Sequence, residues 1–190
     1  MRFFLLYATS QGQTTRIVDH VADRLRKRGH EALICKAQDL GTDTGIDTAS
    51  HGCDAAILAG SVHAGRYQDE LARAARHKSE SLNGVPGLFL SVSLTAAGDD
   101  PAEHVELDRL ANEFLTETGW NNARIVQVAG ALRFLNDDFF EYWAKRWIAR
   151  QHDRRVSGRS DIELTDWHAL DAEIEGFIAS VKPRDQNAAD

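Results

Sequence analysis

The sequence predicts a single doubly wound α/β domain, with a parallel sheet of five strands and helices on both of its faces. Three observations support this prediction. The 190 residues are 43% hydrophobic and 27% charged, which is an ordinary composition for one globular core. Five short apolar runs alternate with segments of helical periodicity, as in chains that form parallel sheets. The apolar runs are continuous rather than alternating, which is typical of strands buried on both faces.

The predicted strands are the apolar runs at residues 3–8, 32–36, 55–59, 88–92 and 125–129. Residues 13–28 are predicted to be a helix, because their apolar residues recur at helical spacing and Gly29 follows as a C-terminal stop. Further helices are predicted at about residues 71–78 and after the fourth strand, where Pro101 suits a first helical turn. Residues 37–54 are rich in Gly, Thr, Asp and Ser, which predicts mostly loop with at most one short helix.

The C-terminal part of the chain is predicted to add one more helix to the sheet, within residues 164–181. Asp166 is its predicted N-cap. Its predicted buried face consists of Trp167, Leu170, Ile174, Phe177, Ile178 and Val181. Residues 1–181 are therefore predicted to form one domain, with an insert at about residues 134–164 after the fifth strand. Residues 182–190 are predicted to be a disordered tail.

Charge and cysteine content exclude several classes of protein. The formal net charge is −7, so the molecule as a whole does not attract nucleic acid or anionic lipid. Cys35 and Cys53 are the only cysteines, which argues against a disulfide framework or a zinc site, and no metal is expected. The apolar stretch near the N-terminus is too short for a signal peptide or a membrane span. We therefore expect a cytoplasmic protein, and a peripheral position at the inner face of the cell membrane stays open.

A neutral polar loop, TSQGQTT at residues 9–15, follows the first predicted strand. Ligands of doubly wound sheets bind outside the carboxyl ends of the strands, where this loop opens. Gly12 allows close backbone approach, the hydroxyls can donate to phosphate oxygens, and the next helix offers free N–H groups. The loop can therefore hold a phosphate without a lysine. The alternative is a hydroxyl-rich helix cap without any ligand.

Two more uncharged loops, GSVHAGRY at residues 60–67 and SLTAAG at residues 93–98, are expected at the same edge of the sheet. The first loop lacks the G-x-G-x-x-G of dinucleotide sites, and GSVHAG is not followed by the Lys-Ser/Thr of a P-loop. Three such loops suit a phosphate joined to a flat, mostly apolar ring, and flavin mononucleotide (FMN) fits that description. The predicted FMN-binding residues are Thr9, Ser10, Gln11, Gly12, Gln13, Thr14, Ser61, Val62, His63, Ser93, Leu94, Thr95 and Ala96.

The pattern Thr9-x-x-Gly12-x-Thr14 after a first strand resembles the phosphate loop of the flavodoxin superfamily. Within it, the chain is most similar to the menaquinone-dependent protoporphyrinogen IX dehydrogenase group, through GQT (12–14), FLSVSL (89–94), AGALRF (129–134) and TDW (165–167). The last two motifs are not expected in short electron-carrier flavodoxins. The resemblance implies a flavodoxin-like sheet of order 2-1-3-4-5 with an inserted helix or loop after strand five. It also implies bound FMN, oxidation of protoporphyrinogen in haem biosynthesis and electron transfer to menaquinone or another quinone.

The insert combines aromatic and basic residues. FFEYWAKRWIAR at residues 139–150 places aromatic side chains on one helix face, and residues 144–159 hold six basic residues and one acidic residue. One interpretation is a sheet-covering helix followed by a solvated loop. The other is a surface for anionic lipid or for the propionates of a porphyrin, with membrane contact through residues 139–159. The candidate substrate or membrane residues are Arg66, Tyr67, Arg133, Trp143, Lys145, Arg146, Trp147 and Arg150.

The sequence contains no evident set of catalytic acids and bases, which fits chemistry carried by a flavin. A porphyrinogen and a quinone are the expected small-molecule substrates, nucleic acid is not an expected partner, and a homo-oligomer stays open. One alternative is a flavodoxin-type FMN electron carrier or quinone reductase without porphyrinogen activity. The least favoured is a flavin-free regulatory domain of receiver type, which needs clustered acids that residues 9–13 and 60–63 lack.

Overall fold

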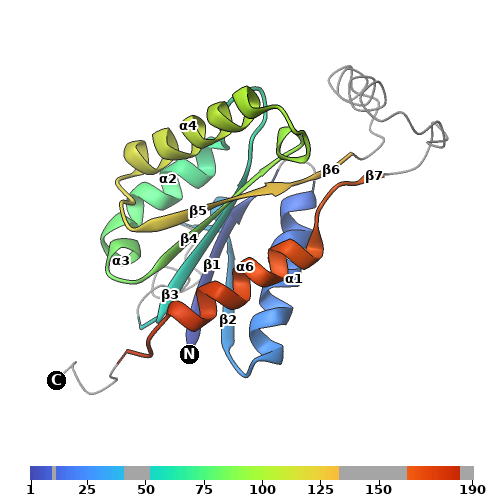
Figure 1. Ribbon diagram of the computed structural model, residues 1–190. Helices are drawn as coiled ribbons and strands as arrows, with labels where there is room; N and C mark the ends of the chain where they lie inside the picture. Colours follow the sequence, from blue (N-terminus) through green and yellow to red (C-terminus); the bar gives the residue numbers. More distant parts are fainter. Residues whose placement is uncertain (10–11, 41–51, 133–161, 185–190) are drawn as a thin grey trace.

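The computed structural model describes residues 1–9, 12–40, 52–132 and 162–184, and it contains the predicted parallel sheet (Figure 1). The strands are β1 (Arg2–Ala8), β2 (Glu31–Lys36), β3 (Ala55–Ser61), β4 (Gly87–Ser93) and β5 (Ala123–Ala129). Their order is β2-β1-β3-β4-β5, and every neighbouring pair is parallel. The predicted fold class and strand order are therefore confirmed, and each strand is slightly longer than its apolar run.

Helices cover both faces of this sheet (Figure 1). One face carries α1 (Gln13–Lys27) and the C-terminal helix α6 (Trp167–Ser180), and the other carries α2 (Asp69–His77), α3 (Ser79–Asn83) and α4 (Pro101–Thr118). Two short 3₁₀ helices, η1 (Ala37–Asp39) and η3 (Thr95–Ala97), lie in the connections. Residues 37–54 were predicted to hold at most one short helix; their described part contains η1, and residues 41–51 lie outside it.

Alternate residues of each central strand enter different cores, which explains why the apolar runs are continuous. Phe3 and Leu5 of β1 pack with α1 and α6, whereas Phe4 and Leu6 pack on the other side with α2 and α4. All four side chains are almost fully buried. A strand that is buried on both faces needs apolar residues at odd and at even positions. Its sequence therefore does not alternate between apolar and polar residues.

Local signals set the ends of two helices as expected. The carboxylate of Asp100 accepts a hydrogen bond from the N–H of Ala102, and Pro101 occupies the first position of α4. Asp166, the predicted N-cap, accepts from the N–H of Ala169 at 2.9 Å. The helices therefore begin where side-chain oxygens replace the missing intrahelical acceptors.

A short antiparallel pair, β6 (Ala131–Leu132) and β7 (Ile162–Glu163), lies beyond the end of β5 (Figure 1). It brackets residues 133–161, which lie outside the described part together with most of the predicted insert. The predicted insert at about residues 134–164 stays a prediction, and its last residues include β7, which pairs with β6. Of the predicted tail, residues 182–184 are described and follow α6, while 185–190 are not described.

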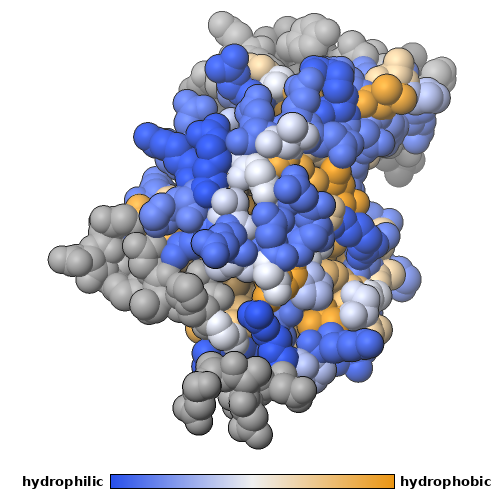
Figure 2. Space-filling view, turned by 90° about the vertical axis from the view of Figure 1, so that its left-hand side faces the viewer, coloured by the Kyte–Doolittle hydropathy of each residue, from blue (hydrophilic) through white to orange (hydrophobic). Residues whose placement is uncertain are grey.

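Both cysteines are free thiols inside the protein. Cys35 and Cys53 are buried and form no disulfide, and burial raises the pKa of Cys53 to about 11, so this thiol stays protonated. Figure 2 shows one side of the molecule as mostly hydrophilic, with hydrophobic side chains in several separate patches. Among the described residues, none of the helices has both the length and the apolar character that crossing a membrane requires.

Asp54 joins the two ends of the described chain, and this gives a testable pH dependence. Its carboxylate accepts the backbone N–H of Arg2 and of Arg184, both at 2.7 Å. Burial alone would raise the pKa of Asp54, but the N–H groups of Arg184 and Arg2 lower it by more, so the pKa lies below its ordinary value. The stabilisation is therefore fully present above the ordinary pKa and is lost as pH falls through the lowered one.

Replacing Asp54 by asparagine should lower the free energy of unfolding at pH 7 by about 1 kcal/mol, because the amide has one acceptor oxygen for two donors. Urea titrations of both proteins from pH 7 to about pH 3 would measure this, since the deficit should shrink once the native carboxylate is protonated. Asp23→Asn, at a more exposed position, is the control. A deficit that is constant over the whole range would contradict the assignment.

Candidate functional site

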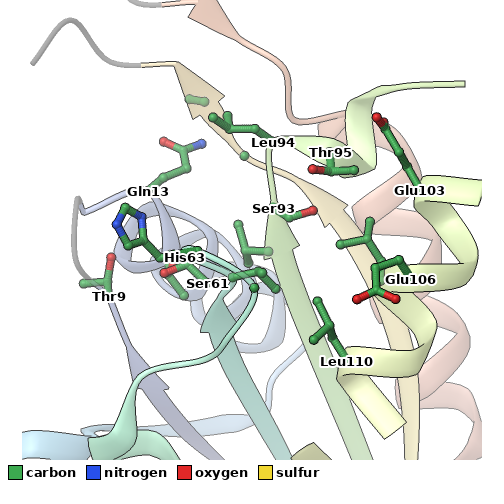
Figure 3. A pocket seen from close by; sticks show the side chains of 18 of the residues that line it. Thr9, Gln13, Ser61, His63, Ser93, Leu94, Thr95, Glu103, Glu106 and Leu110 are labelled. Carbon is green, nitrogen blue, oxygen red and sulfur yellow. The ribbon is translucent and has the colours of Figure 1, made fainter. Parts of the chain in front are cut away.

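A cavity of about 480 Å³ opens at the carboxyl ends of β1, β3 and β4 (Figure 3). Thr9, Gln13 and Thr14 contribute to it from the β1–α1 connection, and residues 61–65 and 93–95 contribute from the next two loops. Figure 3 shows Thr9, Gln13 and His63 on one side of the cavity, with Glu106 and Leu110 on the other. The three loops that the sequence predicted to meet are therefore brought together by the parallel order of the strands.

The first loop is built to leave hydrogen-bond donors open. The N–H of Gly12 donates to the hydroxyl of Thr9 at 2.9 Å, and Gly12 has a φ of 84°, a left-handed conformation that favours glycine. Gly12 is the N-cap of α1 and offers no side-chain cap, so within the described residues no N-cap side chain accepts from the N–H groups of the first turn. These groups and the positive end of the helix dipole favour an anion.

Thr14 is the most informative residue of this loop. Its side chain is 1% exposed, it lines the cavity, and its hydroxyl oxygen has no hydrogen-bond partner within the described structure. A buried hydroxyl without a partner costs free energy, and native structures contain few of them. An anionic oxygen placed in the cavity would satisfy this hydroxyl together with the N–H groups of α1.

The second loop forms a tight turn with small residues at its tip. His63 and Arg66 exchange backbone hydrogen bonds of 2.9 and 3.2 Å, and Ala64 and Gly65 between them have φ values of 49° and 77°. Two consecutive left-handed residues are typical of a type I′ turn. Alanine in this region costs roughly 1 kcal/mol relative to right-handed backbone. The turn therefore borders the cavity with a methyl group and a glycine, which leaves room for a flat ligand.

The third loop is held by the end of β4. The hydroxyl of Ser93 accepts the N–H of Ala96 at 3.0 Å, which closes η3. Leu94 and Thr95 line the cavity, whereas Ala96 is not among the lining residues. The N–H of Gly130 donates to the carbonyl of Ser93 at 2.9 Å and so brings the residues after β5 to the same site.

Several lining residues were not predicted as part of the site, and half of them lie on α4. They are Ala64, Gly65, Val92, Ala102, Glu103, Glu106, Leu107, Leu110, Gly130 and Ala131. The sequence predicts a helix in this region from its periodicity, and that pattern alone does not show which of its residues border a cavity. Hydrogen bonds from Arg109, at 2.6 and 2.8 Å, lower the pKa of Glu106, so this wall of the cavity carries a carboxylate at neutral pH.

Of the two described substrate candidates, Arg66 is exposed and Tyr67 is not. The ring of Tyr67 packs against Phe89 and Phe114, and its hydroxyl donates to Ser91 at 2.8 Å. Burial raises the pKa of Tyr67 to about 12, so it stays neutral. Tyr67 therefore supports the turn from within the core, and its expected contact with a substrate stays a prediction.

The remaining predicted site residues lie outside the described part of the chain. They are Ser10, Gln11, Arg133, Trp143, Lys145, Arg146, Trp147 and Arg150. Among the described residues, no group of three or more His, Cys, Asp or Glu side chains could hold a metal ion. The described site thus consists of hydrogen-bond donors, small residues and one acidic wall.

Several known proteins resemble this chain in sequence or in fold. The profile of the Flavodoxin domain family matches residues 4–152. Protoporphyrinogen IX dehydrogenase [quinone] of Escherichia coli K12 is 23% identical over 170 residues, which cover 90% of this chain and 91% of that protein. The Leishmania major protein of the same name is 24% identical over 183 residues, covering 95% of this chain and 77% of its own length.

A solved structure titled NADH:FMN oxidoreductase (EMOB), apo form, superimposes with a TM-score of 0.61 at 14% identity, over 96% of this chain and 91% of that one. At this identity the likeness shows a shared fold. The family profile covers well over half of the sequence, and the strand order and the position of the cavity agree with it. The chain therefore belongs to the flavodoxin domain family.

Proposed function

We propose that this protein is an FMN-dependent dehydrogenase that oxidises protoporphyrinogen IX and passes the electrons to a quinone. The names of the curated relatives, which align over nearly the whole chain, support the reaction. The observation that most directly supports FMN as the cofactor is the hydroxyl of Thr14. It is buried, has no partner among the described residues, and lies in a cavity beside the start of α1, which has no side-chain cap there. These groups fit a phosphate, and the fit does not depend on a basic residue.

The pairing of Arg16 is consistent with a phosphate that is held without a basic side chain. Arg16, in the second turn of α1, donates to the carboxylate of Glu163 at 2.9 Å, so its charge is already paired. The phosphate would instead accept from the N–H groups of residues 13–15 and from the hydroxyl of Thr14. Binding through oriented donors is favourable because these groups are fixed before the ligand arrives.

The rest of the cavity suits a flat ring. Ala64 and Gly65 are small enough to let a planar group approach, and Val62 and Leu94 add apolar surface. Backbone groups of residues 61–65 and 93–95 can meet the polar edge of that ring. FMN, when bound, supplies the two-electron chemistry that the described side chains do not. The role of these side chains is to orient the ring and to limit access of water to it.

The substrate would approach with its propionates away from α4. Glu106 and Glu113 share the single guanidinium of Arg109, so this group on α4 keeps a net negative charge and would repel an anion, whereas Arg66 is exposed next to the tip of the 63–66 turn. We assign Arg66 to a propionate on this basis. The basic and aromatic residues 139–159 lie outside the described part, so their contact with lipid or porphyrin stays a prediction.

The test is anaerobic oxidation of protoporphyrinogen by the purified protein reconstituted with FMN. Porphyrin fluorescence should rise in proportion to the consumption of a menaquinone analogue, and it should not rise when FMN or the quinone is omitted. A no-enzyme sample corrects for spontaneous oxidation. A protein that binds FMN and exchanges electrons with redox dyes but forms no porphyrin would be an electron carrier or a quinone reductase, and the proposed reaction would be wrong.

A further inference from the structure

The segment that enters α6 contacts the first turn of α1, although the two are far apart in sequence. The side-chain amide nitrogen Nε2 of Gln13 lies 3.0 Å from Oε1 of Glu163 and 3.1 Å from Oγ1 of Thr165. Gln13 and Thr165 are each only 7% exposed. The contact is therefore a buried one, at the start of the helix that faces the cavity.

The chemistry of these groups fixes which of them donate. A carboxylate only accepts, so the NH₂ group of Gln13 faces Glu163. The hydroxyl of Thr165 donates to the carbonyl of Ala129 at 2.7 Å and accepts from Gln13. Both hydrogens of the Gln13 amide are thus used within the protein. Gln13 can still serve a ligand in the cavity through its backbone N–H, but its side-chain donors are occupied.

Residues 163–165 are also connected by hydrogen bonds to the ends of β4 and β5, next to the cavity. The N–H of Leu164 donates to the carbonyl of Gly130 at 3.2 Å, and the N–H of Gly130 donates to that of Ser93 at 2.9 Å. Thr165 bonds to Ala129, the last residue of β5. Residues 163–165 therefore connect the first turn of α1 to the ends of β4 and β5.

The carboxylate of Glu163 is compensated, so it does not act as a repulsive charge beside an anion. Oε1 accepts the N–H of Thr165 at 3.1 Å as well as the Gln13 amide, and Oε2 accepts from Arg16 at 2.9 Å. The guanidinium of Arg16 lies 5.9 Å from the centre of the Trp167 ring. The contacts of Gln13 and Arg16 orient the first two turns of α1 relative to the C-terminal segment.

We propose that Glu163 and Thr165 are positioning residues of the cofactor site. They hold Gln13 so that the free N–H groups of the first turn of α1 and the hydroxyl of Thr14 point to one phosphate position. The site therefore has a fourth element, contributed by the C-terminal part of the chain, besides the three loops after β1, β3 and β4. This inference rests on the proposed binding of FMN, with its phosphate at the start of α1.

Thr165→Val tests this role, because it removes one hydroxyl and leaves the backbone contacts of Leu164 and Gly130 in place. Flavin fluorescence titrations of FMN and of riboflavin, which lacks the phosphate, measure the effect. We expect the affinity for FMN to fall about tenfold, as for loss of one well-placed hydrogen bond, and that for riboflavin to change less than about twofold. Thr165→Ser, which keeps the hydroxyl, should restore FMN affinity to within about twofold.

Thr118→Val is the matched control. Thr118 is also buried, and its hydroxyl also donates to a backbone carbonyl, that of Phe114 at 2.8 Å, but it lies at the C-terminal end of α4. This variant should lose stability without changing either flavin affinity. If Thr165→Val does not fold, Gln13→Met provides a second route. It removes the hydrogen bond to Thr165 from the other side, together with that to Glu163, and should also show a loss specific to FMN.

The outcomes separate this inference from the proposed function. Unchanged FMN affinity in Thr165→Val, or an equal loss of affinity for FMN and riboflavin, would overturn the positioning role. FMN binding by the wild-type protein would still support FMN as the cofactor. Wild-type protein that binds no FMN would remove the proposed function and the inference with it. A double variant Gln13→Met/Thr165→Val that binds FMN no more weakly than either single variant would support the inference, because both residues then act through one contact.

Discussion

Replacement of Thr14 by valine should weaken FMN binding by roughly 10- to 100-fold and should stabilise the FMN-free protein. The hydroxyl of Thr14 is buried and has no partner among the described residues, so the free protein bears the cost of its desolvation. A phosphate oxygen would supply that partner, and hydrogen bonds to charged groups contribute about 1.5–3 kcal/mol. Valine has nearly the same shape, so the apolar replacement should raise the free energy of unfolding of the FMN-free protein by about 1 kcal/mol.

The opposite signs of these two effects make the experiment specific. Urea unfolding of the FMN-free protein gives the stability, and fluorescence titration gives the affinities for FMN and riboflavin. Thr118→Val is again the comparison, because its hydroxyl has partners in Phe114 and Leu115, so the same substitution there should destabilise the protein. A Thr14→Val protein that is less stable and binds FMN normally would show that this hydroxyl has a structural role instead.

The sheet could be predicted because its signals are local. Each central strand is a short continuous apolar run, and the side chains on both of its faces are buried, as at Phe3 and Phe4. Helix ends were predicted where a side chain or a glycine sets them, as at Asp166 and Gly29. The strand order is not visible in any local pattern, and it was available only through the resemblance to the flavodoxin superfamily.

The three loops of the site could be predicted because the carboxyl ends of parallel strands meet at one edge. The contribution of α4 could not, since Leu107 and Leu110 have the spacing of ordinary core residues and nothing in the sequence shows which part of that face is left uncovered. The packing of Tyr67 could not be predicted either, because its ring turns inward to Phe89 and Phe114, which are distant in the sequence.

The contact between Gln13 and the C-terminal segment could not be predicted at all. Its partners are separated by 150 and 152 positions in the sequence, and a single glutamine, glutamate or threonine has no characteristic pattern. In the motif TDW at residues 165–167, the N-cap role of Asp166 was predicted from the sequence and is confirmed, whereas Thr165 entered only through the resemblance. The structure gives Thr165 a physical role, because its hydroxyl bonds to the end of β5.

The second large effect is expected in the core, where Phe89→Ala should lower the free energy of unfolding by about 3–5 kcal/mol. Phe89 is fully buried, and its ring stacks on Phe114 with centroids 4.8 Å apart. Tyr67 and Trp120 complete this cluster at 5.1 and 6.2 Å. Since total stabilities of domains are about 5–15 kcal/mol, such a loss is a large fraction of the whole.

This substitution should also separate the two parts of the cofactor site. Phe89 supports Tyr67, which follows the turn at residues 63–66, so the cavity left by Phe89→Ala should loosen the ring-binding side and leave the start of α1 unchanged. FMN and riboflavin should therefore lose affinity by the same factor, in contrast to Thr14→Val. Urea unfolding and flavin titration measure both effects, with Val105→Ala as a control at a side chain that is 69% exposed. A loss confined to FMN would mean that this core supports the phosphate loop instead.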